Sequence, residues 1–298
     1  MPRSSPEDVV RRLTHLPSAP RVLPKLKRLL SDANSSLHEV VNLIRLDPGI
    51  AARVLQIGNS AYFSHGLRCY TVEEAVHRVG YNQVYELVGN AVAAEVLVRP
   101  LVTYSLGPDE LWQNSVACAV AAERLADRIG LERSIAYTVG LLHQVGLVAI
   151  DEWLQRVAPA VRFVPGPPPL DAIEQERQML GFHNAEAGAA LLRLWDFPAV
   201  MAEPVRWQYL PSATASHGHL ATLLSVAKWI SKAASTPQPP PSPAAAMLRH
   251  CGLSASQLQS EVAHVRSRLS EISSLLDDNR EEHILSFPGG SRVVVPVC

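Results

Sequence analysis

Hydrophobic residues recur every three or four positions along most of the chain, which is the spacing of helices that bury one face. Ser36 followed by Glu39 has the spacing of a capping box, and Asp47 before Pro48 has the form of an N-cap followed by a proline in the first turn. No sustained strand-like alternation precedes the C-terminus, so we expect an all-α fold. The periodicity predicts helices at 111–129, 135–154, 172–180, 185–194, 198–208 and 220–234.

Two proline clusters interrupt the helical pattern. Residues 165–169 read PGPPP and predict a stiff surface loop, whereas residues 237–243 read PQPPPSP and predict a polyproline-type spacer. We therefore expect a main domain at 9–235, a Pro-rich linker at 236–243, and a C-terminal helix with a short tail at 244–298.

Beyond the linker, apolar residues alternate at spacings of four and three, as in the a/d seam of a coiled coil. Glu261 and Arg266 fall at the polar positions between them. Two interpretations stay open: a helix that docks on its own domain, or a homodimer formed through the seam. The seam comprises Leu258, Val262, Val265, Leu269, Ile272 and Leu276.

The composition fits a globular protein with no general affinity for nucleic acid. Apolar residues make up 47% of the 298, and 27 Lys and Arg against 28 Asp and Glu leave a net charge of −1. Broad nucleic-acid binders carry a basic excess, so we expect no nucleic-acid partner. The four cysteines form no CxxC pair, which leaves zinc and redox motifs unsupported.

The chain shows no pattern of targeting or membrane insertion. Its start lacks a charged segment followed by an apolar run, and its longest uncharged stretch, 134–150, is short for crossing a bilayer. We expect a cytoplasmic protein with free thiols and no membrane partner.

A collinear set of motifs resembles the HDOD family, the HD-related output domains of bacterial signalling proteins. The strongest part is LDPGIAARVL at 46–55 followed by GNSAYF at 58–63. The resemblance covers roughly residues 14 to 234 and implies a two-lobed helical domain, with an N-terminal lobe packed on an HD-like lobe. The other matching positions are Leu16-Pro17, TVEEA at 71–75, Val79-Gly80, Leu111-Trp112, Ser115, GLLH at 140–143, Glu176, LGF at 180–182, Ala185-Glu186, Gly188 and LWDFP at 194–198.

HD hydrolases bind divalent metal through His and Asp side chains, and the metal lowers the pKa of the attacking water. The resemblance places these ligands on seven positions, which we call the former metal site. Only His143 is a residue type that the family uses there, and the two acidic positions carry Gln144 and Lys228. We therefore expect no bound metal, no cofactor and no catalytic residue. The former metal site comprises Asn114, His143, Gln144, Asn184, Gln208, Tyr209 and Lys228.

Because the replacements are polar, two occupants of the former metal site stay open. Asn114, His143, Gln144, Asn184 and Gln208 are expected either to hydrogen-bond one another, with or without water, or to admit a small ligand.

Positive charge is concentrated near the N-terminus, where no acidic residue occurs between Val9 and Leu30. The cations of this run are either a solvated face or a site for an anionic partner: an acidic protein surface, a nucleotide or, last, DNA. Arg21, Lys25 and Arg28 share one helical face. The candidates for partner or anion binding are Arg11, Arg12, Arg21, Lys25 and Arg28.

The resemblance implies a non-catalytic bacterial signal-transduction regulator, a pseudoenzyme that acts by protein–protein interaction. Partners of this kind are a histidine kinase, a response regulator or a GGDEF/EAL protein of cyclic-di-GMP signalling. One alternative is a sensor of a nucleotide or cyclic dinucleotide that uses the former metal site. A residual metal-dependent phosphohydrolase is the third.

Overall fold

The computed structural model describes residues 5–11, 13, 22–31, 35–64, 66–80, 83–84, 100–164, 172–211 and 216–277, and within these ranges the chain is all-α. The one extended pairing described there is an isolated bridge between Leu101 and Leu106. The predicted fold class is confirmed. The proline loop at 165–169 and the predicted tail beyond Asp277 lie outside the described residues.

The N-terminal lobe begins its helices where the local sequence predicts. Ser36 accepts from the Glu39 amide at 3.2 Å while the Glu39 carboxylate accepts from Ser36, which completes the capping box. Asp47 accepts from the amide of Ile50 at 2.9 Å. These caps satisfy amides that a helix start leaves unbonded. The helices of this lobe are α2 (Val22–Ser31), α3 (Leu37–Arg45), α4 (Pro48–Gly58), α5 (Ala61–Ser64) and α6 (Val72–Val79).

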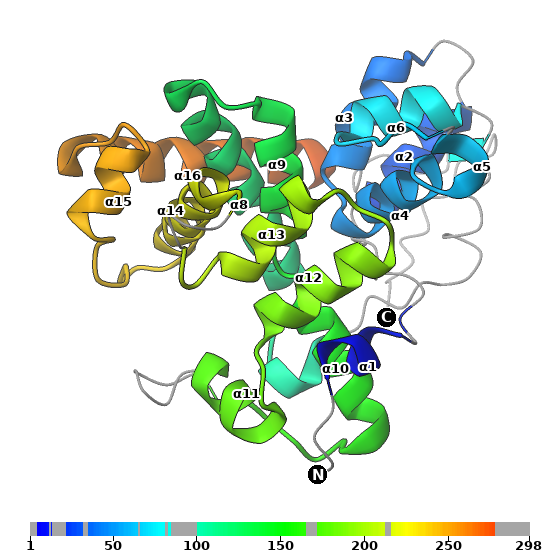
Figure 1. Cartoon of the computed structure of the whole chain (residues 1–298). Helices are drawn as coiled ribbons and strands as arrows, with labels where there is room; N and C mark the ends of the chain where they lie inside the picture. Colours follow the sequence, from blue (N-terminus) through cyan, green and yellow to red (C-terminus); the bar gives the residue numbers. More distant parts are fainter. Residues whose placement is uncertain are drawn as a thin grey trace, which may run out of the picture.

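The larger lobe is built around one long buried helix, α8 (Pro108–Ile129), which packs along α9 and α14 (Figure 1). A second layer forms where α10 packs on α12. The short helix α1 (Pro6–Val10) also packs on α10 and α12. The remaining elements of this lobe are η1 (Val102–Tyr104), α9 (Arg133–Leu142), α10 (Val145–Val157), α11 (Ala172–Leu180), α12 (Asn184–Leu194), α13 (Ala199–Trp207) and α14 (Gly218–Ser235).

The single helix predicted at 135–154 is wrong, because the structure breaks it at His143 and Gln144 into α9 and α10. The His143 side chain bonds the Gly140 carbonyl through Nδ1 at 2.7 Å, an oxygen that a continuing helix would use for the amide of Gln144. A side chain that competes for a helix carbonyl favours an end at that point. This break places two of the predicted site residues, His143 and Gln144, at the junction between α9 and α10.

The C-terminal segment docks on the chain's own main domain. After α15 (Ala245–His250), helix α16 (Ala255–Asp277) lies across α14 and α8 (Figure 1). Five seam residues are buried and Leu269 is partly buried, so the seam packs on the chain's own main domain, and the homodimer stays a prediction. Burying a side chain of this size contributes about 1.5–3 kcal/mol each. The buried five are Leu258, Val262, Val265, Ile272 and Leu276.

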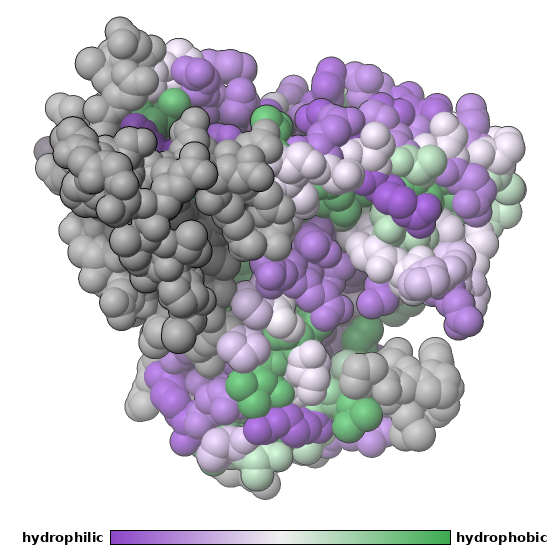
Figure 2. Space-filling view, turned by 180° about the vertical axis from the view of Figure 1, so that it is seen from behind, coloured by the Kyte–Doolittle hydropathy of each residue, from purple (hydrophilic) through white to green (hydrophobic). Residues whose placement is uncertain are grey.

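One apolar segment, Arg133–Val157, is long enough to cross a membrane by length and composition, and 83% of its most apolar window is buried in the protein. It is therefore accounted for as core. Figure 2 shows a described rear surface that is mostly hydrophilic, with hydrophobic residues in small separate patches.

Candidate functional site

Six helices bring the former metal site together. Asn114 lies on α8, His143 and Gln144 at the break between α9 and α10, and Asn184 at the start of α12. Gln208 and Tyr209 follow the end of α13, and Lys228 lies in the middle of α14. The structure thus gathers positions that are more than a hundred residues apart in sequence.

Gly146 allows α10 to approach α12 closely enough to form this arrangement. A Cβ at Gly146 would lie 1.8 Å from the carbonyl oxygen of Asn184 and 2.6 Å from the amide nitrogen of Gly188. No side chain fits in that space, so a glycine is required where the two backbones touch. The contact fixes Gln144 and Asn184 relative to each other.

His143, the one retained ligand type, is buried and held as a neutral imidazole. Burial and the nearby charge of Lys228 lower the pKa of His143 to about 3, against the opposing effect of its bond to Gly140. The Gln208 amide nitrogen donates to the His143 carbonyl at 3.0 Å and to the Val205 carbonyl at 2.9 Å. Gln208 therefore bonds backbone rather than the His143 ring.

Asn184 is bound to a buried carboxylate that sequence reasoning did not place in the site. Glu176 on α11 is fully buried and accepts from the Asn184 amide at 2.6 Å, from its side-chain nitrogen at 2.9 and 3.0 Å, and from the Tyr104 hydroxyl at 2.7 Å. Tyr209 donates its hydroxyl to Asn184 Oδ1 at 2.9 Å. The Glu176 carboxylate thereby bonds Asn184 and Tyr104, and Asn184 in turn bonds Tyr209.

Lys228 supplies the charge at the centre of the site. Its Nζ is buried and lies 3.5 Å from the centroid of the Tyr209 ring, a cation–π contact. Burial lowers the pKa of Lys228 to about 7, although Cys118 and Glu176 act to raise it. The ammonium thus occupies a region where an HD hydrolase concentrates carboxylates.

Asn114 and Gln144 form the more open edge of the site, and both are partly exposed. Gln144 Oε1 lies 3.5 Å from the Ser115 hydroxyl, which is a weak contact, and Ser231 donates to the Asn114 backbone carbonyl at 3.1 Å. The predicted mutual network of five polar side chains is therefore replaced by separate bonds to backbone and to Glu176.

The donor set does not fit a divalent cation. Amide and phenol oxygens carry no charge to compensate a dication, and Lys228 would repel one. Among the residues that the structure describes, no three His, Cys, Asp or Glu side chains cluster as a metal site requires. No chemical step through a bound metal follows from this geometry.

The predicted basic face is divided between the two lobes. Arg11 follows α1, on the larger lobe, and lies 3.7 Å from Asp8, whereas Lys25 and Arg28 are on α2 beside α3. They therefore do not form one surface, because the two segments dock on different helices. Arg12, Arg21 and the side chain of Lys27 lie outside the described residues.

Lys25 and Arg28 instead line a groove with the end of α16. The Lys25 Nζ donates to the Leu275 carbonyl at 2.6 Å, which satisfies part of the α16 C-terminus. The groove has a volume of about 450 Å³, and we call it the α2–α3–α16 groove. Its lining residues are Lys25, Arg28, Leu29, Glu39, Asn42, Leu43, Leu46, Leu275 and Leu276.

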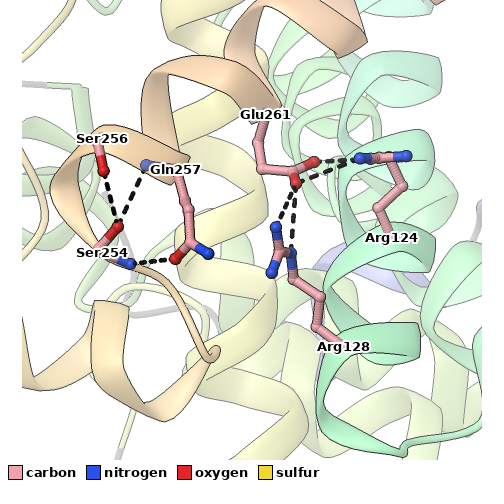
Figure 3. Close-up of polar contacts among 6 residues, drawn as sticks. All are labelled: Arg124, Arg128, Ser254, Ser256, Gln257 and Glu261. Carbon is pink, nitrogen blue, oxygen red and sulfur yellow. Dashed lines mark hydrogen bonds and ion pairs between the residues drawn. The ribbon is translucent and has the colours of Figure 1, made fainter.

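Helix α16 is locked onto α8 by a buried carboxylate (Figure 3). Arg124 Nε lies 2.6 Å from Oε2 of Glu261, and Arg128 Nη2 lies 3.1 Å from Oε1. Glu261 is 2% exposed. Burial raises the pKa of Glu261, but the hydrogen bonds and charges of the two arginines outweigh it and lower the pKa overall. The sequence had placed Glu261 at a polar position of the seam, and the arginines explain why it is buried.

A family model matches most of the chain. The HDOD domain model matches residues 16–211. The chain belongs to the HDOD domain family. The HDOD match covers the N-terminal lobe, the larger lobe as far as α13, and all of the former metal site except Lys228, and it ends before α14, the linker and α16.

Individual relatives of this HDOD chain are distant. A protein of Treponema pallidum (strain Nichols), described only as uncharacterized, is 30% identical over 228 residues, which are 72% of this chain and 42% of that protein. The chain thus spans less than half the length of this curated relative.

Solved structures show the same HDOD fold. The MmoQ response regulator of Methylococcus capsulatus str. Bath has a TM-score of 0.68 at 23% identity, covering 85% of this chain and 99% of that one. A virulence factor of Campylobacter jejuni subsp. jejuni has a TM-score of 0.64 at 17% identity, covering 89% and 99%. At these identities the likeness is one of fold.

Proposed function

We propose that this chain is a non-catalytic regulator of bacterial signal transduction that acts by protein–protein interaction through its HDOD domain. The observation that carries the proposal is the replacement of the acidic metal ligands by Gln144 and Lys228. A lysine can bind and orient an anionic group, but it cannot lower the pKa of water as a bound metal does. A domain of this kind can therefore act by binding without hydrolysing its ligand.

The α2–α3–α16 groove is the docking surface that we assign to this role. Its apolar lining, which we call its floor, includes Leu29, Leu43 and Leu46, and the charged residues that line it are Lys25, Arg28 and Glu39. Leu275 beside them is 56% exposed, although it lies on a docked helix. An amphipathic acidic segment of a signalling partner would place leucine-like side chains on the floor and carboxylates against the two cations. We expect a histidine kinase, a response regulator or a GGDEF/EAL protein to supply it.

The groove can be tested with purified partners of these classes. A Lys25→Glu/Arg28→Glu variant reverses the charge at the groove edge, and a Lys232→Glu/Arg249→Glu variant makes the same change at exposed positions of α14 and α15. We expect binding measured by biolayer interferometry to weaken roughly tenfold or more in the first variant only. Equal binding by both variants would remove the groove from the proposal.

Catalysis is tested separately, with phosphoesters and added manganese. We expect hydrolysis at the level of a buffer control. Metal-dependent turnover that is lost in His143→Ala would contradict the non-catalytic role.

A second function, a sensor of a small ligand, is favoured by one observation at the former metal site. Among the side chains described, buried polar atoms without a hydrogen-bond partner occur on His183, Gln208 and Lys228. All three belong to or adjoin this site. Because nearly all buried polar groups in folded proteins are bonded, such a cluster points to a partner from outside the chain.

A further inference from the structure

Two of the three residues with unpartnered atoms contact the ring of Tyr209, and the third is its neighbour in the chain. Lys228 Nζ lies 3.5 Å from the centroid of Tyr209, the His183 ring meets Tyr209 edge-on with centroids 5.6 Å apart, and Gln208 precedes Tyr209 in the chain. His183 Nδ1 has the Glu186 carboxylate at 3.7 Å as its nearest ionic contact. Lys228 has no ion pair within the described part of the chain, so its ammonium lacks a counter-charge at ion-pair distance.

The groups that act on Lys228 come from several of the helices around it. They are the Cys118 thiol on α8, the neutral His143 at the end of α9, Glu176 on α11, and His183 with Tyr209. Glu176 is the only acid among them, and its oxygens already accept from Tyr104 and Asn184. The lysine therefore keeps most of its hydrogen-bonding capacity for another acceptor.

The former metal site has a buried part and a partly exposed part. Asn114, Gln144 and Tyr209 are each partly exposed, whereas the Nζ of Lys228 is buried, as are His143, Asn184 and Gln208. In the described structure, the amide nitrogens of Asn114 and Gln144 make no hydrogen bond to another side chain, and neither is buried. The former metal site thus combines a buried ammonium with two partly exposed amide side chains.

We propose that the former metal site binds an oxyanion group, the phosphoryl or carboxylate of a small molecule, between Lys228 and the amides of Asn114 and Gln144. The inference rests on the sensor function above and not on the α2–α3–α16 groove. Charge-assisted hydrogen bonds to an ammonium are among the strongest that an oxyanion can make. The fold thereby carries a positive centre at positions where the resemblance to HD hydrolases places a metal, but a lysine binds the anion without activating water.

Isothermal titration calorimetry at pH 6.5 tests the site with inorganic phosphate and with acetate, each against chloride at the same ionic strength. Lys228→Met removes the charge and keeps the length, and Lys232→Met makes the same substitution one turn along α14 at an exposed position. We expect saturable heat for one or both anions in the wild type and in Lys232→Met. Lys228→Met should bind roughly tenfold more weakly or not at all.

Gln144→Glu provides a second test, because it adds a negative charge at the partly exposed side of the former metal site and leaves Lys228 in place. A carboxylate there should weaken phosphate binding by a similar factor through repulsion. Equal binding in Lys228→Met and the wild type, or no heat beyond chloride in the wild type, overturns the site. Since neither variant touches the α2–α3–α16 groove, partner binding by the same proteins shows whether the protein-interaction role stands or falls with it.

Discussion

Single residues decide what the former metal site can do, and Lys228 decides most. A fully buried ammonium without a hydrogen-bond partner is costly to fold, since it has left water and found only a ring face and a distant carboxylate. Proteins retain such groups at functional sites more often than in structural cores. The residue is therefore the first place to measure both stability and binding.

Lys228→Met should stabilise the protein at pH 6 by about 2 kcal/mol or more, because it removes this buried charge. The pKa of Lys228 is lowered to about 7 in the folded state, so between pH 7 and the ordinary lysine pKa of 10.5 the unfolded chain holds a proton that the folded chain lacks. Wild-type stability must then rise with pH above 7. Urea unfolding at pH 6, 7.5 and 9 should show the two proteins converging, and a pH-independent difference would refute the buried charge.

Gly146→Ala should be among the most damaging substitutions in the chain. The added Cβ would meet the Asn184 carbonyl at 1.8 Å, so α10 and α12 must move apart at a cost of about 3 kcal/mol or more. Gly107→Ala is the matched control, because no atom lies within 4 Å of a Cβ there. Thermal unfolding should separate the two variants widely; equal melting temperatures would mean that the two helices are not in such close contact.

At the scale of elements, α16 combines features that its own sequence determines with one contact to residues far away in the chain. Ser254 and Gln257 form a capping box at its start, with the Gln257 side chain accepting from the Ser254 amide at 2.9 Å (Figure 3), and the seam faces inward. Both follow from spacing within one helix. The lock at Glu261 depends on two arginines more than a hundred residues away, so a local pattern could place it only as a polar position.

Glu261→Gln should loosen α16, because two arginines lose their shared counter-charge. We expect a loss of about 2 kcal/mol at pH 7 by urea unfolding and faster proteolysis in the linker at 236–243. The pKa of Glu261 is lowered in the folded protein, so its contribution is complete above the ordinary glutamate pKa of 4.5 and is lost as the pH falls through the lower folded value. The difference between variant and wild type should accordingly shrink below pH 4.5.

Glu271→Gln is the control on the same helix, since Glu271 pairs with Arg268 at half-exposed positions. It should leave stability and linker cleavage unchanged. If it matches Glu261→Gln in both measurements, α16 is held by its apolar seam and not by the arginine lock.

At the scale of the whole molecule, the sequence predicted what depends on neighbours in the chain. The all-α class, the helix starts at Ser36 and Asp47, and the spacer before the last helices follow from spacing and composition. The division of the basic face between lobes did not, because it depends on where α1 and α2 dock. The burial of Glu176 could not be foreseen either, since an isolated glutamate on an amphipathic helix ordinarily faces solvent.

The assembled molecule is an HDOD fold in which Lys228 lies at a position where the resemblance to HD hydrolases places a metal ligand. Its two lobes are joined by a C-terminal helix whose end borders a basic groove. Each of these two surfaces carries a lysine or arginine, and we propose that they bind negatively charged partners, one small and one macromolecular. Neither offers the carboxylates that metal-dependent hydrolysis requires.

Manganese binding tests this claim most directly. The protein is equilibrated with excess Mn²⁺, passed through a desalting column and analysed for metal, with His143→Ala as the matched variant. We predict less than roughly a tenth of an equivalent in both proteins, because the donors are neutral and Lys228 is cationic. One equivalent retained by the wild type and lost in His143→Ala would contradict the proposal that the site binds without catalysing.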